Sequence, residues 1–199
     1  NMIVAAGADR VLTMDLHAAQ IQGFFDIPVD HLYAAPVLIR HLREHYVKDL
    51  NNLVVVSPDV GGVKMARAYS DALGAELAIV AKHRFNATHV EAMNVIGEVE
   101  GRDVVLIDDM TETAGTLCAA ANILKERGAQ RVFACVSHGV LGDMARDRIS
   151  GSSIERVLTS DTVPMAHGPK VDCVSVGDLL GHAVQRIHDG ESVSSLFDI

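Results

Sequence analysis

The chain has 199 residues, of which 49% are hydrophobic, and a formal net charge of −9 from 17 basic and 26 acidic residues. This length and apolar content suit one large domain or two small ones with a buried core, and they exclude a disordered tail. The acidic balance leaves no basic stripe that would track a nucleic-acid backbone, so we expect no nucleic-acid partner.

The beginning of the chain lacks a clear helix start. The opening NMIVAAG is typical of the end of a helix, and one predicted strand precedes a turn-prone stretch that Pro28 and Pro36 bracket. We place a boundary there, before a new helix, and expect that a preceding part of the first domain is missing. The opening also lacks the order of a signal peptide, and no run of about 18 apolar residues follows, so we expect a cytoplasmic protein with no membrane partner.

Short apolar runs alternate with helical stretches along the chain. The expected strands are VLTMDL, NLVVVSP, ELAIVA, DVVLIDD, RVFACVSH, SIERVLTS and KVDCVSV. This alternation predicts a parallel sheet with helices on both faces, and the unbroken runs LVVV and VVLI predict central strands that are buried on both sides. We therefore predict an α/β fold in three layers.

In an open α/β sheet, ligands bind beyond the carboxyl ends of the strands, which we call strand exits. Two strand exits in the first half of the chain carry polar residues. His17 follows VLTMDL, where a metal or phosphate contact competes with the commoner role of a lone histidine as a structural or surface residue. In SPDVGGVK, Gly61 and Gly62 let the backbone approach phosphate oxygens, and Asp59 can bind Mg²⁺. A Gly-Gly pair before a helix is also ordinary turn chemistry, so both interpretations stay open.

The run ELAIVA leads into KHR. Lys82 and Arg84 alternate, so in an extended segment both side chains project to one side and can converge on a polyphosphate. In isolation, a solvated pair of loop charges is the better interpretation. Beside two phosphate-binding loops, the polyphosphate contact is favoured.

The exit that follows VVLI carries the most chemistry. Asp108 and Asp109 are costly at the end of a buried strand unless they face a cleft, where they accept hydrogen bonds from ribose hydroxyls or help to hold magnesium. Small side chains and free N–H groups from Thr113 to Thr116 then precede a helix, whose N-terminus favours a phosphate. The alternative is a helix N-cap with incidental acids. The combination predicts a site for ribose 5-phosphate.

Together these segments resemble one family, the ribose-phosphate pyrophosphokinases, also called phosphoribosyl pyrophosphate synthetases. The similar segments, in the family's order, are DLHAAQIQGFFDIPVD, SPDVGGVK, KHR, DDMTETAGT and GESVSSLF. The resemblance implies a parallel-sheet α/β/α fold of the type I phosphoribosyltransferase kind. It also implies a remnant of the N-terminal domain in residues 1–34, a C-terminal phosphoribosyltransferase-like domain in residues 35–178, and a closing helix and tail in residues 179–199.

The resemblance implies a role for each segment. Ribose 5-phosphate is bound by Asp108, Asp109, Glu112, Thr113, Ala114, Gly115 and Thr116. The pyrophosphate loop consists of Asp59, Val60, Gly61 and Gly62, and Mg²⁺ is bound by His17 and Asp59. The catalytic residues are Lys82 and Arg84, which stabilise charge as the sugar oxygen attacks the β-phosphorus. The residues of a regulatory site for inorganic phosphate and ADP between subunits are Ser192, Ser194 and Phe197.

The implied reaction transfers the β,γ-pyrophosphoryl group of ATP to O1 of ribose 5-phosphate, which gives phosphoribosyl pyrophosphate and AMP for nucleotide biosynthesis. Mg²⁺ is the implied cofactor, and a homo-oligomer, a hexamer in the family, is the implied assembly. The sequence departs from the family in two ways. Glu112 stands where the family's loop usually has Asp, and the part before Asn1, which supplies most of the adenine pocket, is missing. We therefore predict that this chain alone binds ATP poorly.

Two rival functions share parts of this pattern. A phosphoribosyltransferase that consumes phosphoribosyl pyrophosphate has the same strand and phosphate loop, but it requires neither KHR nor SVSSLF. A non-catalytic regulatory homologue keeps the fold without the chemistry. The presence of His17, Asp59, Lys82 and Arg84 argues against that second rival.

Overall fold

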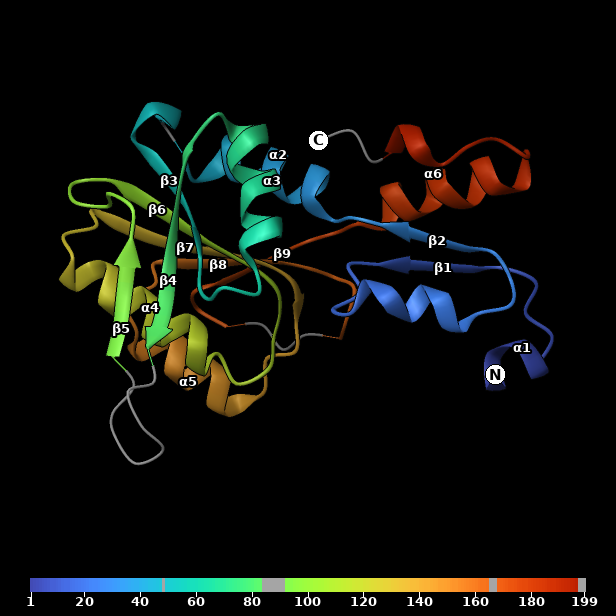
Figure 1. Cartoon of the computed structure of the whole chain (residues 1–199), viewed down its shortest axis with the longest axis horizontal. Helices are drawn as coiled ribbons and strands as arrows, with labels where there is room; N and C mark the ends of the chain where they lie inside the picture. Colours follow the sequence, from blue (N-terminus) through green and yellow to red (C-terminus); the bar gives the residue numbers. More distant parts are fainter. Residues whose placement is uncertain (48, 84–91, 165–167, 197–199) are drawn as a thin grey trace.

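The computed structural model describes residues 1–47, 49–83, 92–164 and 168–196 (Figure 1). The strands are β1 (Val11–Met14), β2 (Val29–Leu32), β3 (Leu53–Ser57), β4 (Glu76–His83), β5 (Ala92–Ile96), β6 (Asp103–Thr111), β7 (Arg131–Gly139), β8 (Arg156–Ser160) and β9 (Val171–Val174). The α-helices are α1 (Met2–Ala5), α2 (Ala35–His45), α3 (Val63–Leu73), α4 (Gly115–Glu126), α5 (Asp143–Gly151) and α6 (Gly177–His188). Short 3-10 helices are η1 (Ala19–Phe24), η2 (Leu50–Asn52) and η3 (Ser194–Leu196). Within these ranges, no helix is both long enough and apolar enough to cross a membrane.

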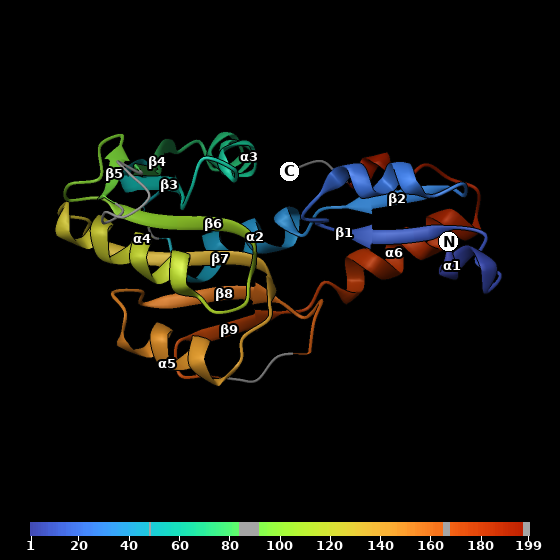
Figure 2. The same cartoon turned by 60° about the horizontal axis from the view of Figure 1, so that its bottom comes forward.

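The larger sheet has the strand order β5-β4-β3-β6-β7-β8-β9, and its pairs are parallel except for β4 with β5. Alternate residues of β3 face opposite layers, because side chains alternate along a strand. Val54 and Val56 pack in one apolar cluster with residues of α4 and α5, whereas Leu53 and Val55 pack in another with residues of α2 and α3. Figure 2 shows the arrangement of these helices around the sheet. The predicted three-layer α/β/α fold is confirmed, and β3 is buried along its whole length, as its unbroken apolar run indicated.

Two strands were not predicted. The stretch between Pro28 and Pro36, which we expected to be a turn, contains β2, so that expectation was wrong. The two prolines lie just outside this strand: the carbonyl of Pro28 accepts a hydrogen bond from the N–H of Val11, and Pro36 lies in the first turn of α2, where no N–H donor is needed. Strand β5 is the other, and it runs antiparallel at the edge of the sheet.

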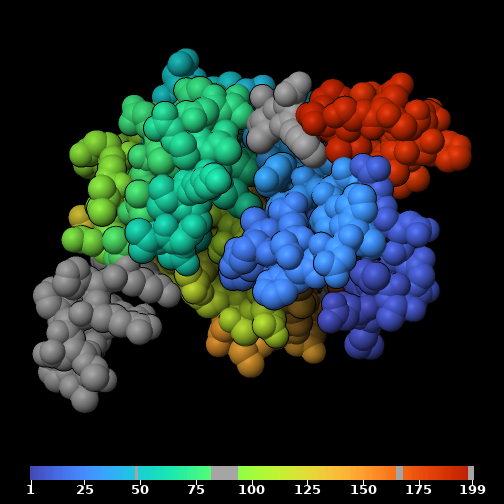
Figure 3. Space-filling view, turned by 45° about the vertical axis from the view of Figure 1, so that its right-hand side comes forward, coloured from blue at the N-terminus to red at the C-terminus, as the bar shows by residue number. Residues whose placement is uncertain are grey.

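The smaller sheet consists of β1 and β2, which pair in parallel. It lies beside α6, so the first and last parts of the chain are neighbours (Figures 1 and 3). Leu12 of β1 and Leu180 of α6 pack against the same apolar cluster. Helix α2 begins at Ala35, directly after the proposed boundary, whereas the proposed closing segment from residue 179 begins inside α6. The division into three segments stays a proposal.

The chain order of the larger sheet reverses between β3 and β6. From β3 the sheet continues through β4 to β5, and from β6 it continues through β7 and β8 to β9. The loops that leave β3 and β6 therefore turn to opposite faces of the sheet and open a crevice beyond the carboxyl ends of the two strands. The predicted pyrophosphate loop and the predicted ribose 5-phosphate loop both leave the sheet at this point.

Candidate active site

Asp108 and Asp109 lie near the end of β6, at the crevice. The backbone N–H of Asp109 donates to Oδ1 of Asp108 at 3.0 Å. The pKa of Asp108 is raised to about 7, mainly because the carboxyl group is buried and secondly because of the negative charge of Asp109. A bound cation, or hydroxyl groups that donate to the carboxylates, would relieve this cost. The ribose or magnesium role of this pair stays a prediction, and the raised pKa of Asp108 supports it.

His17 follows β1 and reaches across to Asp109. Its Nδ1 lies 2.6 Å from Oδ2 of Asp109, although the two residues are 92 positions apart. This hydrogen bond, together with the negative charges of Asp109, Asp108 and Asp59, raises the pKa of His17 above its ordinary value. The ring is 74% exposed, and its Nε2 has no hydrogen-bond partner among the described residues. The structure therefore brings the predicted metal position and the predicted ribose position into contact.

The loop after β3 is held by hydrogen bonds between its own residues. Oδ1 of Asp59 accepts hydrogen bonds from the N–H groups of Gly61 at 2.8 Å and Gly62 at 3.0 Å, and the hydroxyl of Ser57 donates to the carbonyl of Asp59 at 2.6 Å. A Cβ on Gly62 would lie 2.9 Å from Oγ of Ser57, so the turn has no room for a side chain there. Asp59 thus occupies the two N–H donors that the sequence suggested for phosphate oxygens. The pyrophosphate role stays a prediction, and it requires Asp59 to turn away, which a bound cation would favour.

The loop after β6 leads into α4 through a strained residue. Ala114 is buried and has a left-handed backbone with φ +55°, which costs a non-glycine residue roughly 1 kcal/mol or more. The N–H of Cys118 donates to the carbonyl of Ala114 at 2.9 Å and begins the ladder of helix bonds. The N–H groups of Gly115 and Thr116 come before this bond, so they are available to an anion. This geometry suits the predicted 5-phosphate contact.

The structure says less about the predicted catalytic residues and about Glu112. Arg84 and Phe197 lie outside the described residues. Lys82 is in β4, where its backbone pairs with Met93 of β5. Glu112 is exposed and is the first residue of the loop after β6. The catalytic role of Lys82 and Arg84 stays a prediction.

Two of the three predicted regulatory residues, Ser192 and Ser194, line a separate hollow of about 420 Å³. Its lining residues are Arg10, Gln22, Val29, Asp30, His31, Tyr33, Ser192, Val193 and Ser194. The hydroxyl of Ser192 donates to Oγ of Ser194 at 3.0 Å and accepts from the N–H of Ser194 at 3.2 Å. Ser192 and Ser194 are thus brought together with the segment around β2, and their effector role stays a prediction.

Sequence reasoning missed the residues that hold the exit of β1 in place. Asp15 is buried, and its carboxylate accepts hydrogen bonds from the hydroxyl of Ser137 at 2.5 Å and the N–H of Ala34 at 3.0 Å. Nε2 of His138 lies 3.1 Å from the carbonyl of Met14 and 3.0 Å from that of Asp15. These bonds tie the segment before His17 to β7. Asp15 belongs to the quoted DLHAAQ segment, but no spacing in the sequence points to Ser137 or His138.

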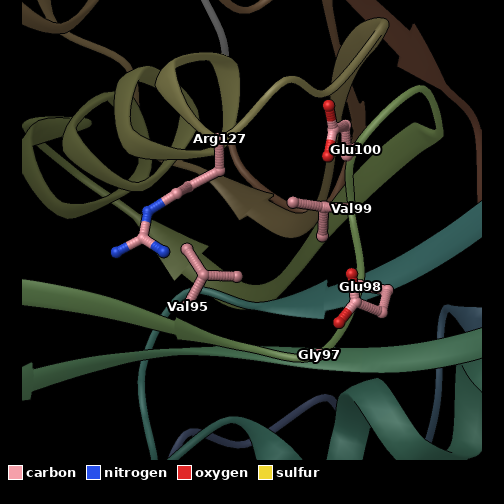
Figure 4. A pocket seen from close by; sticks show the side chains of 6 residues that line it. All are labelled: Val95, Gly97, Glu98, Val99, Glu100 and Arg127. Atoms are coloured by element: carbon pink, nitrogen blue, oxygen red, sulfur yellow. The ribbon is translucent and has the colours of Figure 1, made fainter.

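A second hollow of about 310 Å³ lies away from this site, between the turn before β6 and the C-terminal end of α4. Figure 4 shows Arg127 on one side of it and Glu98 and Glu100 on the other. Because these residues lie near the beginning of β6, they are at the opposite end of that strand from Asp108 and Asp109. This hollow is not part of the candidate active site.

The acidic pair makes the stability of the ligand-free protein depend on pH. Because the pKa of Asp108 is about 7 in the folded chain and lower in the unfolded chain, its contribution to stability is fully present below the unfolded pKa of about 4. That contribution is lost as the pH rises through 7. Asp108→Asn removes the ionisation, so we expect the variant to have the higher melting temperature at pH 8, with the difference shrinking steadily towards pH 5.

Thermal unfolding of the unmodified and variant chains from pH 5 to pH 8 measures this difference. Asp147→Asn, a change of an exposed carboxylate on α5, is the matched control and should give no such trend. A melting-temperature difference for Asp108→Asn that stays constant over this range would contradict the assignment.

Comparison with known proteins gives a consistent result. The family model of the phosphoribosyl synthetase-associated domain matches residues 84–198. A ribose-phosphate pyrophosphokinase of Chlorobaculum tepidum is 51% identical over 200 residues, which cover 100% of this chain and 61% of that relative. A ribose-phosphate pyrophosphokinase of Burkholderia pseudomallei is 52% identical over 201 residues, which cover 99% and 62%. The chain thus spans about three fifths of the length of these relatives.

Comparison with solved structures points to the same family. Phosphoribosylpyrophosphate synthetase from Mycobacterium smegmatis superimposes with a TM-score of 0.87 and 37% identity, over 95% of this chain and 62% of that one. An adenine phosphoribosyltransferase matches with a TM-score of 0.50 and 17% identity, over 63% of this chain and 76% of that one. The second similarity shows a shared fold alone.

Proposed function

The chain belongs to the ribose-phosphate pyrophosphokinase family, and from this premise we propose that it serves the transfer of the pyrophosphoryl group of ATP to O1 of ribose 5-phosphate. One observation carries the proposal. His17, from the exit of β1, contacts Asp109, from the exit of β6, directly before the strained turn that opens α4. The metal, sugar and phosphate positions that we propose would thus follow one another along a single crevice.

Ribose 5-phosphate fits this sequence of positions. Its hydroxyls would donate to the carboxylates of Asp108 and Asp109, which relieves the burial cost that raises the pKa of Asp108. Its phosphate would accept from the N–H groups at the start of α4, between Thr113 and Thr116. Positioning the sugar in this way presents its O1 to the second substrate, and positioning of this kind supplies much of the rate enhancement in phosphoryl transfer.

A divalent cation, which we propose to be Mg²⁺, would be held by His17 and Asp59. Within the described ranges, no three or more His, Cys, Asp or Glu side chains form a ready-made metal site. Mg²⁺ usually takes one or two protein ligands together with waters and substrate phosphates, so the pair fits an ion that arrives with ATP. When bound, the ion would neutralise phosphate charge. Nδ1 of His17 is directed to Asp109, which leaves Nε2 for the ion and fixes the ring.

The ATP side of the site is formed by the loop from Asp59 to Gly62. Release of the Gly61 and Gly62 donors from Asp59 would make a cradle for the pyrophosphoryl group. Lys82 and Arg84 would stabilise the charge that develops as O1 attacks the β-phosphorus. We further propose that the protein works in a cytoplasmic homo-oligomer, with inorganic phosphate and ADP as effectors.

The rival functions are disfavoured on specific grounds. The base-transferring rival explains the loop after β6 but not the contact of His17 with Asp109, which comes from a segment of the smaller sheet. The non-catalytic rival explains sugar binding by the acidic pair, but it gives no reason for the presence of His17, Asp59, Lys82 and Arg84 together.

The test is an assay that shows whether the chain makes phosphoribosyl pyrophosphate or consumes it. The chain is incubated with ATP, Mg²⁺ and ribose 5-phosphate, and AMP and phosphoribosyl pyrophosphate are quantified over time. We expect the two products in equal amounts. Consumption of phosphoribosyl pyrophosphate with a free base would support the base-transferring rival, and binding of ribose 5-phosphate without any AMP would support the non-catalytic one.

A further inference from the structure

We propose that Arg148 is a positioning residue for the ribose 5-phosphate loop, an inference that rests on the proposed function of that loop. Arg148 lies in the last turn of α5, which packs beside α4 on the same face of the sheet. Its Nη1 donates to the carbonyl of Thr113 at 3.0 Å. The residue thus reaches the loop from a helix that carries no predicted site residue.

The contact acts on the strained turn. The Thr113 carbonyl belongs to the peptide unit that also contains the N–H of Ala114, and in a trans peptide these two groups point in opposite directions. Holding the carbonyl towards Arg148 therefore turns the N–H of Ala114 away from α5. Ala114 is left-handed and Gly115 begins the helix, so consecutive N–H groups form a concave nest for an anion.

The guanidinium of Arg148 also lies over the start of α4. A Cβ added to Gly115 would lie 3.4 Å from Nη1 of Arg148, an ordinary van der Waals distance, so the guanidinium is directly beside the first residue of α4. The charge of Arg148 also acts on Cys118, one turn into α4: burial raises the pKa of that thiol, and Arg148 opposes the rise. Arg148 therefore contributes positive charge at the first turn of α4, next to the loop where the phosphate is expected.

Among the described residues, no carboxylate forms an ion pair with Arg148. Thr113 is its hydrogen-bond acceptor. Arg146, two residues earlier on the same helix, differs because it pairs with Asp143. In a chain with a net charge of −9, an arginine without an ion pair in the described part of the chain, beside a nest of N–H groups, is suited to a phosphate dianion.

The test compares Arg148→Met, Arg148→Lys and the matched control Arg146→Met. Binding of ribose 5-phosphate is measured by calorimetry, and the pKa of its bound phosphate is followed by ³¹P NMR. We expect Arg148→Met to weaken binding about tenfold, as for loss of a hydrogen bond to a charged group, and to raise the pKa of the bound phosphate towards its free value. Arg148→Lys should restore part of both effects, and Arg146→Met should change neither.

The outcomes separate this inference from the proposed function. Failure of the unmodified chain to bind ribose 5-phosphate would overturn both. Normal binding by the unmodified chain, with affinity within twofold and an unchanged phosphate pKa in Arg148→Met, would overturn the role of Arg148 alone. A lower melting temperature in Arg148→Met without loss of affinity would also overturn it, because that pattern belongs to a purely structural residue.

Discussion

Replacement of Asp109 by alanine is expected to weaken the binding of ribose 5-phosphate about a hundredfold, on the order of 2.7 kcal/mol. Two effects add. The sugar loses a charged acceptor for its hydroxyls, and His17 loses the carboxylate that lies 2.6 Å from its Nδ1 and orients its ring. Calorimetric titration of both chains with ribose 5-phosphate measures the difference.

Two companion variants make this result specific. Asp147→Ala removes an exposed carboxylate on α5 and should leave the affinity unchanged. Glu112→Asp restores the residue that the family's loop usually has, and it should retain the affinity of the unmodified chain or improve it. A loss of less than threefold in Asp109→Ala would show that Asp109 does not hold the sugar.

The second large effect concerns stability. Asp15→Ala is expected to lower the free energy of unfolding by about 3 kcal/mol, because the variant leaves the hydroxyl of Ser137 and the N–H of Ala34 buried without their acceptor. Position 15 also has a left-handed backbone with φ +41°, which alanine adopts at a cost that asparagine largely avoids. Urea unfolding of the two chains measures the loss.

Asp15→Asn is the matched control for this variant. Asparagine keeps an oxygen acceptor and tolerates the left-handed backbone, so we expect it to lose about 1 kcal/mol. If both variants lose the same free energy of unfolding, the loss is due to the missing negative charge and not to the missing hydrogen-bond acceptor. Substitutions of ordinary surface residues change the free energy of unfolding by about 0.5 kcal/mol at most. A smaller loss of unfolding free energy in Asp15→Ala would contradict the view that this carboxylate holds the end of β1 against β7.

Strands buried on both faces were predictable from the sequence, whereas partly exposed strands were not. LVVV and VVLI are apolar at every position because both faces of β3 and β6 are covered by helices. Strand β2 contains Asp30 and His31 and has a single partner, so its apolar signal is short and interrupted. Strand β5 contains Asn94 and lies at the sheet edge, where Asn94 and Ile96 are exposed, so a continuous apolar run is not required.

The site was predictable where chemistry follows a strand and unpredictable where it depends on tertiary contacts. The strand-exit rule identified Asp59 and Asp108, and the family resemblance placed them in one site. The bonds of Asp15 with Ser137 and of Arg148 with Thr113 join residues 122 and 35 positions apart through one hydrogen bond each. Such contacts leave no periodicity or spacing in the sequence, so they became visible once the strands and helices were placed.

The most direct test of the central claim is calorimetric titration of ribose 5-phosphate into the unmodified chain, with ribose and inorganic phosphate as separate ligands. The arrangement of Asp108, Asp109 and the turn at Ala114 predicts saturable binding of one ribose 5-phosphate per chain, far tighter than either fragment. Absence of saturable heat with ribose 5-phosphate, or equal affinity for inorganic phosphate alone, would contradict the claim that this crevice is the acceptor-sugar site.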